Sequence, residues 1–105
     1  MAFVMLQYDR PTDTRHWHDY NGRVREWIDL LLAIPGAISF VAYRSANDAS
    51  PNTTAMLEFP TVEEARNATR SEQLQAVHQG LRKVGSIARV LVIVRSPFTP
   101  EPVRS

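Results

Sequence analysis

The sequence has no cysteine, no long apolar run and no excess of charge of one sign. Without cysteine among its 105 residues, the chain excludes disulfide bonds, thiolate metal sites and a cysteine nucleophile. No apolar run approaches the ~20 residues of a membrane-spanning helix. Twelve basic and eleven acidic residues leave a net charge of +1. The basic residues are scattered, so we expect no nucleic-acid partner.

The length and the two ends of the chain predict how the protein is organised. Residues 1–9 are apolar but too short and too uncharged for a signal peptide, so we expect a cytoplasmic protein with no membrane partner. A chain of this length predicts one domain, residues 1–105. It buries only about two-thirds of its unfolded surface, so a core shared in a homodimer would stabilise it. Three prolines in residues 96–105 predict an extended tail that could reach across a partner subunit.

Apolar periodicity and turn residues predict six elements, in the order strand, helix, strand, strand, helix, strand. Their expected ranges are 3–8, 14–32, 37–45, 53–59, 61–84 with a break near Ser71, and 87–95. The order βαββαβ is the ferredoxin-like plan, an α+β fold with an antiparallel sheet. The second and third strands should form a hairpin, because the residues between them have the chemistry of a turn.

Local signals predict where these elements begin and end. Thr12 or Asp13 can cap the first helix, and Pro35-Gly36 ends it. Thr61 and Glu64 match a capping box, in which each side chain bonds the other residue's backbone amide. The last strand is nearly continuous in β-branched residues, which is typical of a strand covered on both faces.

The three histidines do not predict a metal site. His16 and His18 lie about 200° apart on a helix, so they cannot chelate one ion, and no carboxylate cluster completes a ligand set. We therefore expect no metal. We interpret His18 as solvent-facing.

One edge of the first helix has candidate catalytic residues. His16, Tyr20 and Trp27 are spaced i, i+4 and i+11 beside the apolar stripe. An imidazole and a phenol there could hydrogen-bond a ligand against which the tryptophans pack. The alternative is that Tyr20 and Trp27 are core residues and that His16 is a partly exposed helix residue.

The second helix has a further candidate base, His78. It lies beside Leu74 and Leu81 on the helix and could face the space between helix and sheet; the alternative is an ordinary boundary histidine. Gly80 in the same helix costs roughly 1 kcal/mol relative to alanine, which indicates close approach by another group.

Polar residues interrupt the apolar alternation of the strands. Glu58 and Arg89 could pair with each other or with a ligand, because buried polar groups need partners. Gln7 is a third such residue. The alternative is that all three lie at strand ends and reach water. We interpret Arg44 and Arg95 as solvent-facing strand ends.

Several segments together resemble the dimeric α/β-barrel superfamily, and within it the antibiotic-biosynthesis-monooxygenase branch. Residues 35–44 are similar to its "PGF…F…R" stretch. Residues 58–59 and 61–65 are similar to the start of its second helix, and residues 71–78 to the "S-x-x-x-x-A-x-H" segment that follows. The resemblance covers nearly the whole chain.

The resemblance implies two ferredoxin-like protomers packed sheet against sheet, each with a pocket between sheet and helices. It implies a cofactor-independent monooxygenase, or a related cyclase or isomerase, that acts on a small planar aromatic or polyketide-like substrate. In that reading His16 or His78 is the base and Tyr20 a hydrogen-bond donor, and no cofactor is expected. The residues expected to contact substrate are Gln7, Trp17, Trp27, Phe40 and Tyr43.

Two other functions stay open. The first is a non-catalytic, dimeric ligand-binding or accessory protein. The second is a haem-binding oxygenase, because His78 matches the iron ligand of the haem-degrading branch. That branch has a tryptophan where this chain has Ala68 and an asparagine near the position of Gln7. The related EthD-type proteins have a histidine in the first helix, where residues 21–25 of this chain have none.

Overall fold

Four antiparallel strands form one sheet in the order β2-β3-β1-β4. The computed structural model describes residues 1–105. In chain order the elements are β1 (Ala2–Tyr8), α1 (Thr14–Leu32), β2 (Ser39–Arg44), β3 (Thr53–Phe59), α2 (Val62–Ala68), α3 (Glu72–Lys83) and β4 (Arg89–Val94). The predicted ferredoxin-like α+β fold is confirmed, including the hairpin of β2 and β3.

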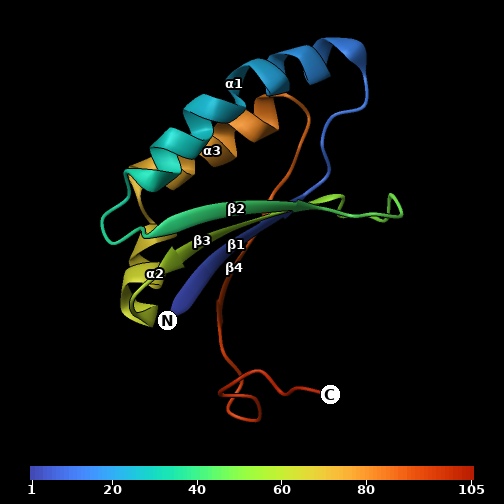
Figure 1. Ribbon diagram of the computed structural model, residues 1–105. Coiled ribbons are helices and arrows are strands. Elements are labelled where there is room, and N and C mark those ends of the chain that lie inside the picture. The colour runs from blue at the N-terminus through green and yellow to red at the C-terminus, as the bar shows by residue number, and fades with distance from the viewer.

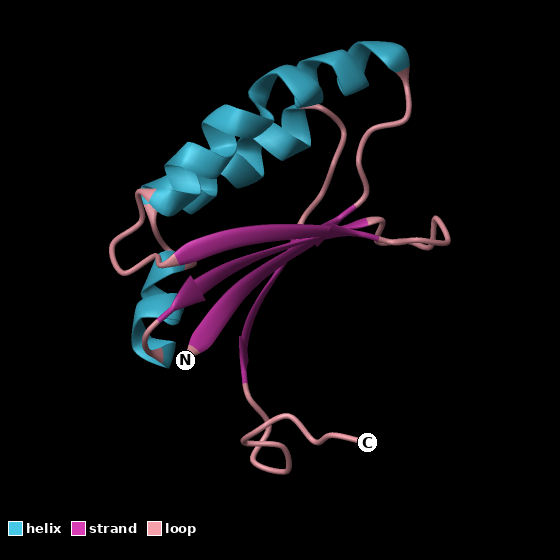
Figure 2. Ribbon diagram, viewed as in Figure 1, coloured by secondary structure: helices cyan, strands magenta, loops and turns pink.

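All three helices lie on one side of the sheet or at its end (Figure 1). Helices α1 and α3 run side by side across one face, and the short α2 lies near the start of β1 (Figure 2). None of the helices has the length and apolar composition needed to cross a membrane.

The core lies between the helices and the sheet, because alternate strand residues point to the helices. From β1 and β3 the buried residues are Ala2, Val4, Leu6, Ala55, Leu57 and Phe59. From α1 and α3 they are Tyr20, Trp27, Leu31, Leu74, Val77 and Leu81. The helical residues recur every three or four positions, which places them on one face of each helix.

Side-chain caps fix where the helices begin. Asp13 caps α1, and its carboxylate accepts a hydrogen bond from the His16 N–H at 2.9 Å. The long second helix expected from the sequence is interrupted at residues 69–71, close to the predicted break. Ser71 caps the new helix α3 by accepting from the Leu74 N–H.

The capping box expected at α2 is only half formed. Thr61 accepts a hydrogen bond from the Glu64 N–H at 3.2 Å, but the Glu64 carboxylate does not bond back to Thr61. It lies instead against Gly36, where a Cβ would overlap it. Gly36 has a φ of 89°, a conformation that favours glycine. Tertiary contact therefore replaces the second hydrogen bond of the box.

The second face of the sheet is bare in this chain. Met5 lies opposite Met56 on one side and Leu91 on the other, so apolar side chains continue across three strands. Leu91 on the β4 edge and Tyr43 on the β2 edge are exposed on this face. The expectation that the last strand is covered on both faces is therefore wrong for the single chain, since the helices cover one face only.

Residues 96–105 contain neither helix nor strand. They lead away from the sheet after β4 (Figure 1). A turn in which the Thr99 N–H bonds the Ser96 carbonyl at 3.0 Å bends this segment.

Candidate functional site

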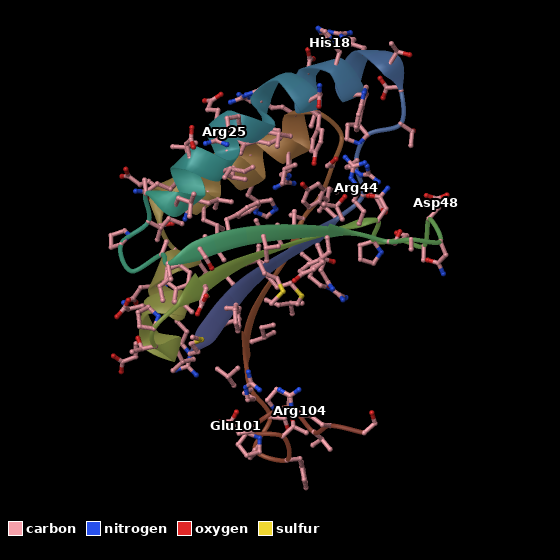
Figure 3. All side chains as sticks on the ribbon, in the orientation of Figure 1. His18, Arg25, Arg44, Asp48, Glu101 and Arg104 are labelled. Carbon is pink, nitrogen blue, oxygen red and sulfur yellow. The ribbon has the colours of Figure 1, made fainter.

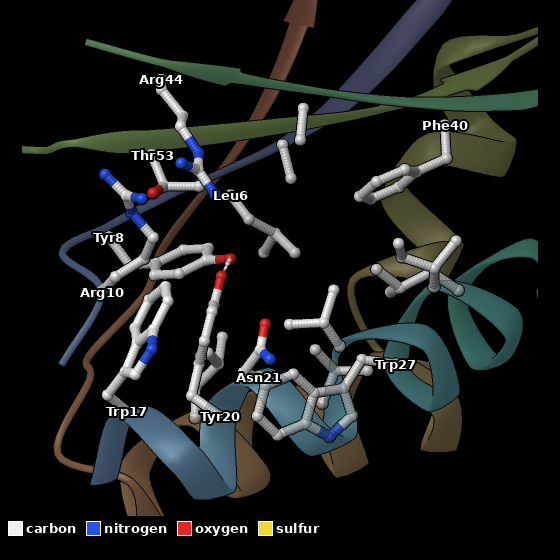
Figure 4. Close-up of a pocket in the computed structure, with 17 residues that line it drawn as sticks. Leu6, Tyr8, Arg10, Trp17, Tyr20, Asn21, Trp27, Phe40, Arg44 and Thr53 are labelled. Atoms are coloured by element: carbon white, nitrogen blue, oxygen red, sulfur yellow. Dashed lines mark hydrogen bonds between the residues drawn. The ribbon is translucent and has the colours of Figure 1, made fainter. Parts of the chain in front are cut away.

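A cavity of about 200 Å³ lies between α1 and the helix-facing side of the sheet. Figure 4 shows its lining. The sheet and the loop after β1 contribute Leu6, Tyr8, Arg10, Phe40, Ala42, Arg44, Thr53 and Ala55. The helices contribute Trp17, Tyr20, Asn21, Val24, Trp27, Ile28, Leu31, Val77 and Leu81.

Two alanines explain why this part of the interior is hollow. Ala42 on β2 lies opposite Ala55 on β3, and Ala55 lies opposite Leu6 on β1. The row of inward residues one step along has Phe40 opposite Leu57, which fills the same space. Because these two side chains are only methyl groups, space remains between this part of the sheet and α1.

Aromatic rings from α1 form one wall. The Trp17 and Tyr20 rings are stacked, with centroids 5.8 Å apart and planes inclined by 23°. The Tyr20 and Trp27 rings meet edge to face, with centroids 5.7 Å apart. Trp17 is 38% exposed whereas Trp27 is 4% exposed, so Trp17 lies at the mouth and Trp27 deep inside. Such walls hold flat apolar rings well.

Two tyrosine hydroxyls meet inside the cavity. The oxygens of Tyr8 and Tyr20 are 2.7 Å apart, drawn as a dashed line in Figure 4. Burial, reinforced by this hydrogen bond, raises the pKa of the Tyr8 phenol well above its ordinary value, while Arg10 and Arg44 act in the opposite direction. Tyr8 is therefore protonated at neutral pH and serves as a donor or acceptor, not as a base.

Polar residues gather at one end of the cavity. Arg44 lies opposite Thr53, and Thr53 lies opposite Tyr8, so the three form one row across β2, β3 and β1. Arg10 follows β1 and reaches the same end (Figure 4). Phe40 and Trp27 lie at the other end. The cavity is amphipathic along its length.

Trp27 packs against Gly80 of α3. A Cβ at Gly80 would lie 2.8 Å from the indole nitrogen, which identifies the close approach expected from the sequence. The guanidinium carbon of Arg23 lies 5.3 Å from the Trp27 ring centroid on the same helix. The indole N–H is buried without a hydrogen-bond partner. It faces Gly80, so it is not a donor aimed at the cavity.

The structure brings together four of the residues named from the sequence. Trp17, Tyr20, Trp27 and Phe40 all line the cavity. Tyr43 does not, because it alternates with Ala42 and Arg44 and therefore lies on the bare face of the sheet.

The remaining candidates lie outside the cavity lining. Gln7 is on the bare face, next to Met5 in the alternation. His16 bonds the Asp13 carboxylate at 2.7 Å, at the start of α1. His78 is half-buried on α3 but does not line the cavity. His18 lies on the outer side of α1, away from the sheet (Figure 3).

Sequence reasoning missed Tyr8, Arg10 and Arg44. Arg44 is the exposed last residue of β2, as the sequence analysis interprets it, but it alternates with Phe40 and Ala42 and therefore also lines the cavity. The same alternation places Tyr8 beyond Leu6. The alternation of the strands could therefore have predicted that Tyr8 and Arg44 face the helices. Arg10 follows the strand, and nothing in the sequence predicts its direction.

Glu58 and Arg89 do not pair with each other. Glu58 lies opposite Phe3, and Arg89 lies opposite Gln7, on the two sides of β1. The Glu58 carboxylate instead accepts a hydrogen bond from the Ser39 hydroxyl at 3.0 Å. No group of three or more His, Asp or Glu side chains is placed to hold a metal ion.

Comparisons with known proteins define the fold class. No family model matches the sequence, and no curated protein matches it. Solved structures do match. One is a protein of Deinococcus radiodurans assigned to the antibiotic biosynthesis monooxygenases, with a TM-score of 0.71, 5% identity, and 100% of this chain and 98% of that chain covered.

Two other solved structures have the same fold. SnoaB of Streptomyces nogalater, a cofactor-independent oxygenase, matches with a TM-score of 0.66 and 11% identity over 95% of this chain and 98% of that chain. An ethyl tert-butyl ether D (EthD) family protein of Bacillus halodurans matches with a TM-score of 0.66 and 16% identity over 91% and 99%. The chain has the ferredoxin-like fold of the antibiotic-biosynthesis-monooxygenase-like proteins, as the sequence resemblance predicted.

Proposed function

We propose that the protein is a cofactor-independent monooxygenase, or a related cyclase or isomerase, acting on a small planar aromatic or polyketide-like molecule. The observation that supports this best is the cavity itself. It combines stacked aromatic walls with two hydroxyl groups 2.7 Å apart, the combination that orients a flat, oxygenated ring. The kind of activity is that of the structural neighbour SnoaB.

The chemistry asks little of the protein beyond orientation and exclusion of water. An activated ring methylene loses a proton to solvent at the mouth of the cavity, since no histidine or carboxylate lines it, and the resulting carbanion reduces O₂. One oxygen atom becomes the new carbonyl and the other leaves as water, so CH₂ and O₂ give C=O and H₂O. We propose that Tyr20, held by Tyr8, hydrogen-bonds a substrate oxygen and stabilises the negative charge that forms on it. Trp17, Trp27 and Phe40 hold the ring.

A non-catalytic ligand-binding role is the second candidate, and one observation favours it. No histidine and no carboxylate lines the cavity, and the pKa of Tyr8 is raised by burial. A side chain that could remove a proton from the substrate is therefore not within the lining. In this role the same walls and hydroxyls hold a ligand without changing it.

Oxygen consumption separates the two roles. The purified protein is mixed with 1,8-dihydroxyanthrone, a planar phenolic ring system with an activated methylene, in air-saturated buffer containing a chelator. For the enzyme we expect O₂ uptake above the spontaneous rate, one O₂ per carbonyl formed, and loss of that excess in Tyr20→Phe. Saturable binding of the compound with no excess O₂ uptake and no rearranged product would establish the binding role.

We also propose that the bare sheet face packs against a second copy of the chain. Apolar side chains cross three strands of this face, and Leu91 and Tyr43 are exposed on it. Glu58 on β3 lies beside the start of β1 and Arg89 on β4 beside its end, on the other side, so a negative and a positive group lie on one diagonal of the face. A two-fold axis between two stacked sheets, perpendicular to that diagonal, brings each Glu58 over the partner's Arg89.

A further inference from the structure

The polar end of the cavity has two guanidinium groups without acidic partners. The ion pairs of the protein join His16 to Asp13, Arg23 to Glu26 and Arg25 to Asp29, all on or beside α1. Neither Arg10 nor Arg44 forms one. We infer that these two arginines bind the carboxylate of a planar aromatic acid whose ring lies between the walls of the cavity. The inference rests on the proposed function only in placing a small molecule in this cavity.

The hydrogen bonds of the two arginines leave their outer donors free. Arg44 makes no side-chain hydrogen bond. The Arg10 Nε donates to the Asn52 side-chain oxygen at 3.4 Å, and the Arg10 backbone N–H donates to the same oxygen at 2.9 Å. Asn52 thus orients Arg10 while both of its terminal nitrogens stay available. A guanidinium presents such donors as a fork that matches the two oxygens of a carboxylate.

The nearest acidic residue does not neutralise this end of the cavity by pairing. Asp9 precedes Arg10, but its two carboxylate oxygens accept hydrogen bonds from the Ser50 hydroxyl and the Asn52 N–H. The carboxylate is therefore fixed to the β2–β3 loop. Two positive charges therefore remain at this end of the cavity, that of Arg10 half-buried and that of Arg44 exposed.

The size of the cavity limits the ligand. An apolar cavity of about 150 Å³ binds benzene, so about 200 Å³ holds one or two fused rings, with any remainder projecting past Trp17 at the mouth. A carboxylate conjugated to such a ring stays in the ring plane. It can therefore reach Arg10 and Arg44 while the ring extends toward Phe40, which lies at the end of the cavity away from the two arginines (Figure 4).

Calorimetric titration with three matched probes tests the inference: 2-naphthoate, its neutral analogue 2-naphthamide, and 2-naphthalenesulfonate. We expect 2-naphthoate to bind at least about tenfold more tightly than the amide, because a charge-assisted hydrogen bond exceeds a neutral one by about that factor. Arg44→Gln and Arg10→Gln should each reduce naphthoate affinity about tenfold and leave amide affinity within about twofold. Arg70→Gln, an exposed arginine between α2 and α3, is the matched control and should change neither.

Each other outcome overturns the inference. Equal affinity for 2-naphthoate and 2-naphthamide means that the cavity binds aromatic ligands whatever their charge. The proposed function then stands. A preference for the acid that survives in both arginine variants, or that is also lost in Arg70→Gln, places recognition elsewhere. Tighter binding of the sulfonate than of the carboxylate rejects the carboxylate class. Absence of binding by all three probes rejects both the inference and the proposed small-molecule cavity.

Discussion

The hydroxyl oxygens of Tyr8 and Tyr20 lie 2.7 Å apart although the residues are separated by 12 positions and belong to a strand and a helix. One hydroxyl donates to the other, so each satisfies its partner at the edge of the cavity. The pair ties the end of β1 to the first turns of α1.

Removing both hydroxyls of this pair should cost less stability than the sum of the two single removals. In Tyr8→Phe the buried hydroxyl of Tyr20 loses its partner, and the free energy of unfolding should fall by about 1–3 kcal/mol. In the double variant Tyr8→Phe/Tyr20→Phe no unpaired hydroxyl remains, so the loss should be smaller than the sum of the two single losses. Urea unfolding of the four proteins gives the coupling energy. Strict additivity would contradict a direct bond.

Filling the floor of the cavity should abolish binding while the fold is kept. Ala42→Leu places a branched side chain where Ala42 and Ala55 leave space. We expect ligand affinity to fall about tenfold or more, since about 1.4 kcal/mol of lost contact corresponds to tenfold. Ala76→Leu, on the exposed side of α3, is the control and should bind normally. Unchanged affinity in Ala42→Leu, measured by calorimetry, would place the ligand elsewhere.

Two glycines in helices should respond to alanine with opposite signs. Gly80→Ala brings a methyl group to within 2.8 Å of the Trp27 indole nitrogen, so it should destabilise the protein despite the better helix propensity of alanine. Gly22 has nothing within 4 Å of the same position, so Gly22→Ala should stabilise it by roughly 0.5–1 kcal/mol. Thermal unfolding decides. A gain in both variants would show that α1 and α3 pack less closely than described.

Asp9 should make stability depend on acid pH. The hydrogen bond from Ser50, followed by that from the Asn52 N–H, holds the pKa of Asp9 below its ordinary value. Its contribution is present above the unfolded-state pKa of about 3.9 and is lost as the pH falls through the folded-state pKa. Asp9→Asn should therefore be less stable than the parent at pH 7 and equally stable near pH 2. A difference that persists at pH 2 would assign the effect to geometry instead of charge.

The proposed dimer should depend on the bare sheet face. Leu91→Glu places a charge beside Met5 in the apolar row of that face, so the variant should be monomeric in light scattering at concentrations where the parent is dimeric. Leu32→Glu, an exposed leucine at the end of α1, should leave the dimer intact. Glu58→Arg should weaken association, and Glu58→Arg/Arg89→Glu should restore it. A monomeric parent chain would refute the proposal.

The fold was predictable because local and periodic signals agree along most of the chain. The helix at 14–32 and the strand at 53–59 were predicted to the residue, since Asp13, Pro35 and the alternation of β3 mark them clearly. The half-formed capping box was not predictable. Its second half is lost because Glu64 meets Gly36, a residue 28 positions away, and the sequence records no such contact.

The cavity was harder to predict than the fold. The apolar spacing along α1 predicts that Tyr20 and Trp27 face the sheet, but it does not say whether they fill the core or line a cavity. The hollow, however, results from the pairing of Ala42 with Ala55, and strand register was not part of the prediction. His16 shows the other difficulty, because a helix-capping carboxylate at Asp13 determines where its imidazole points.

Both tryptophans of the chain, Trp17 at the mouth and Trp27 at depth, belong to the wall of the same cavity. The tryptophan emission of the protein therefore comes entirely from this wall. An occupant that stacks on the rings or displaces water from them alters the whole tryptophan signal, with no background from elsewhere in the molecule. Ligand binding can thus be followed in the unlabelled protein, and a library of aromatic acids can be screened by tryptophan fluorescence.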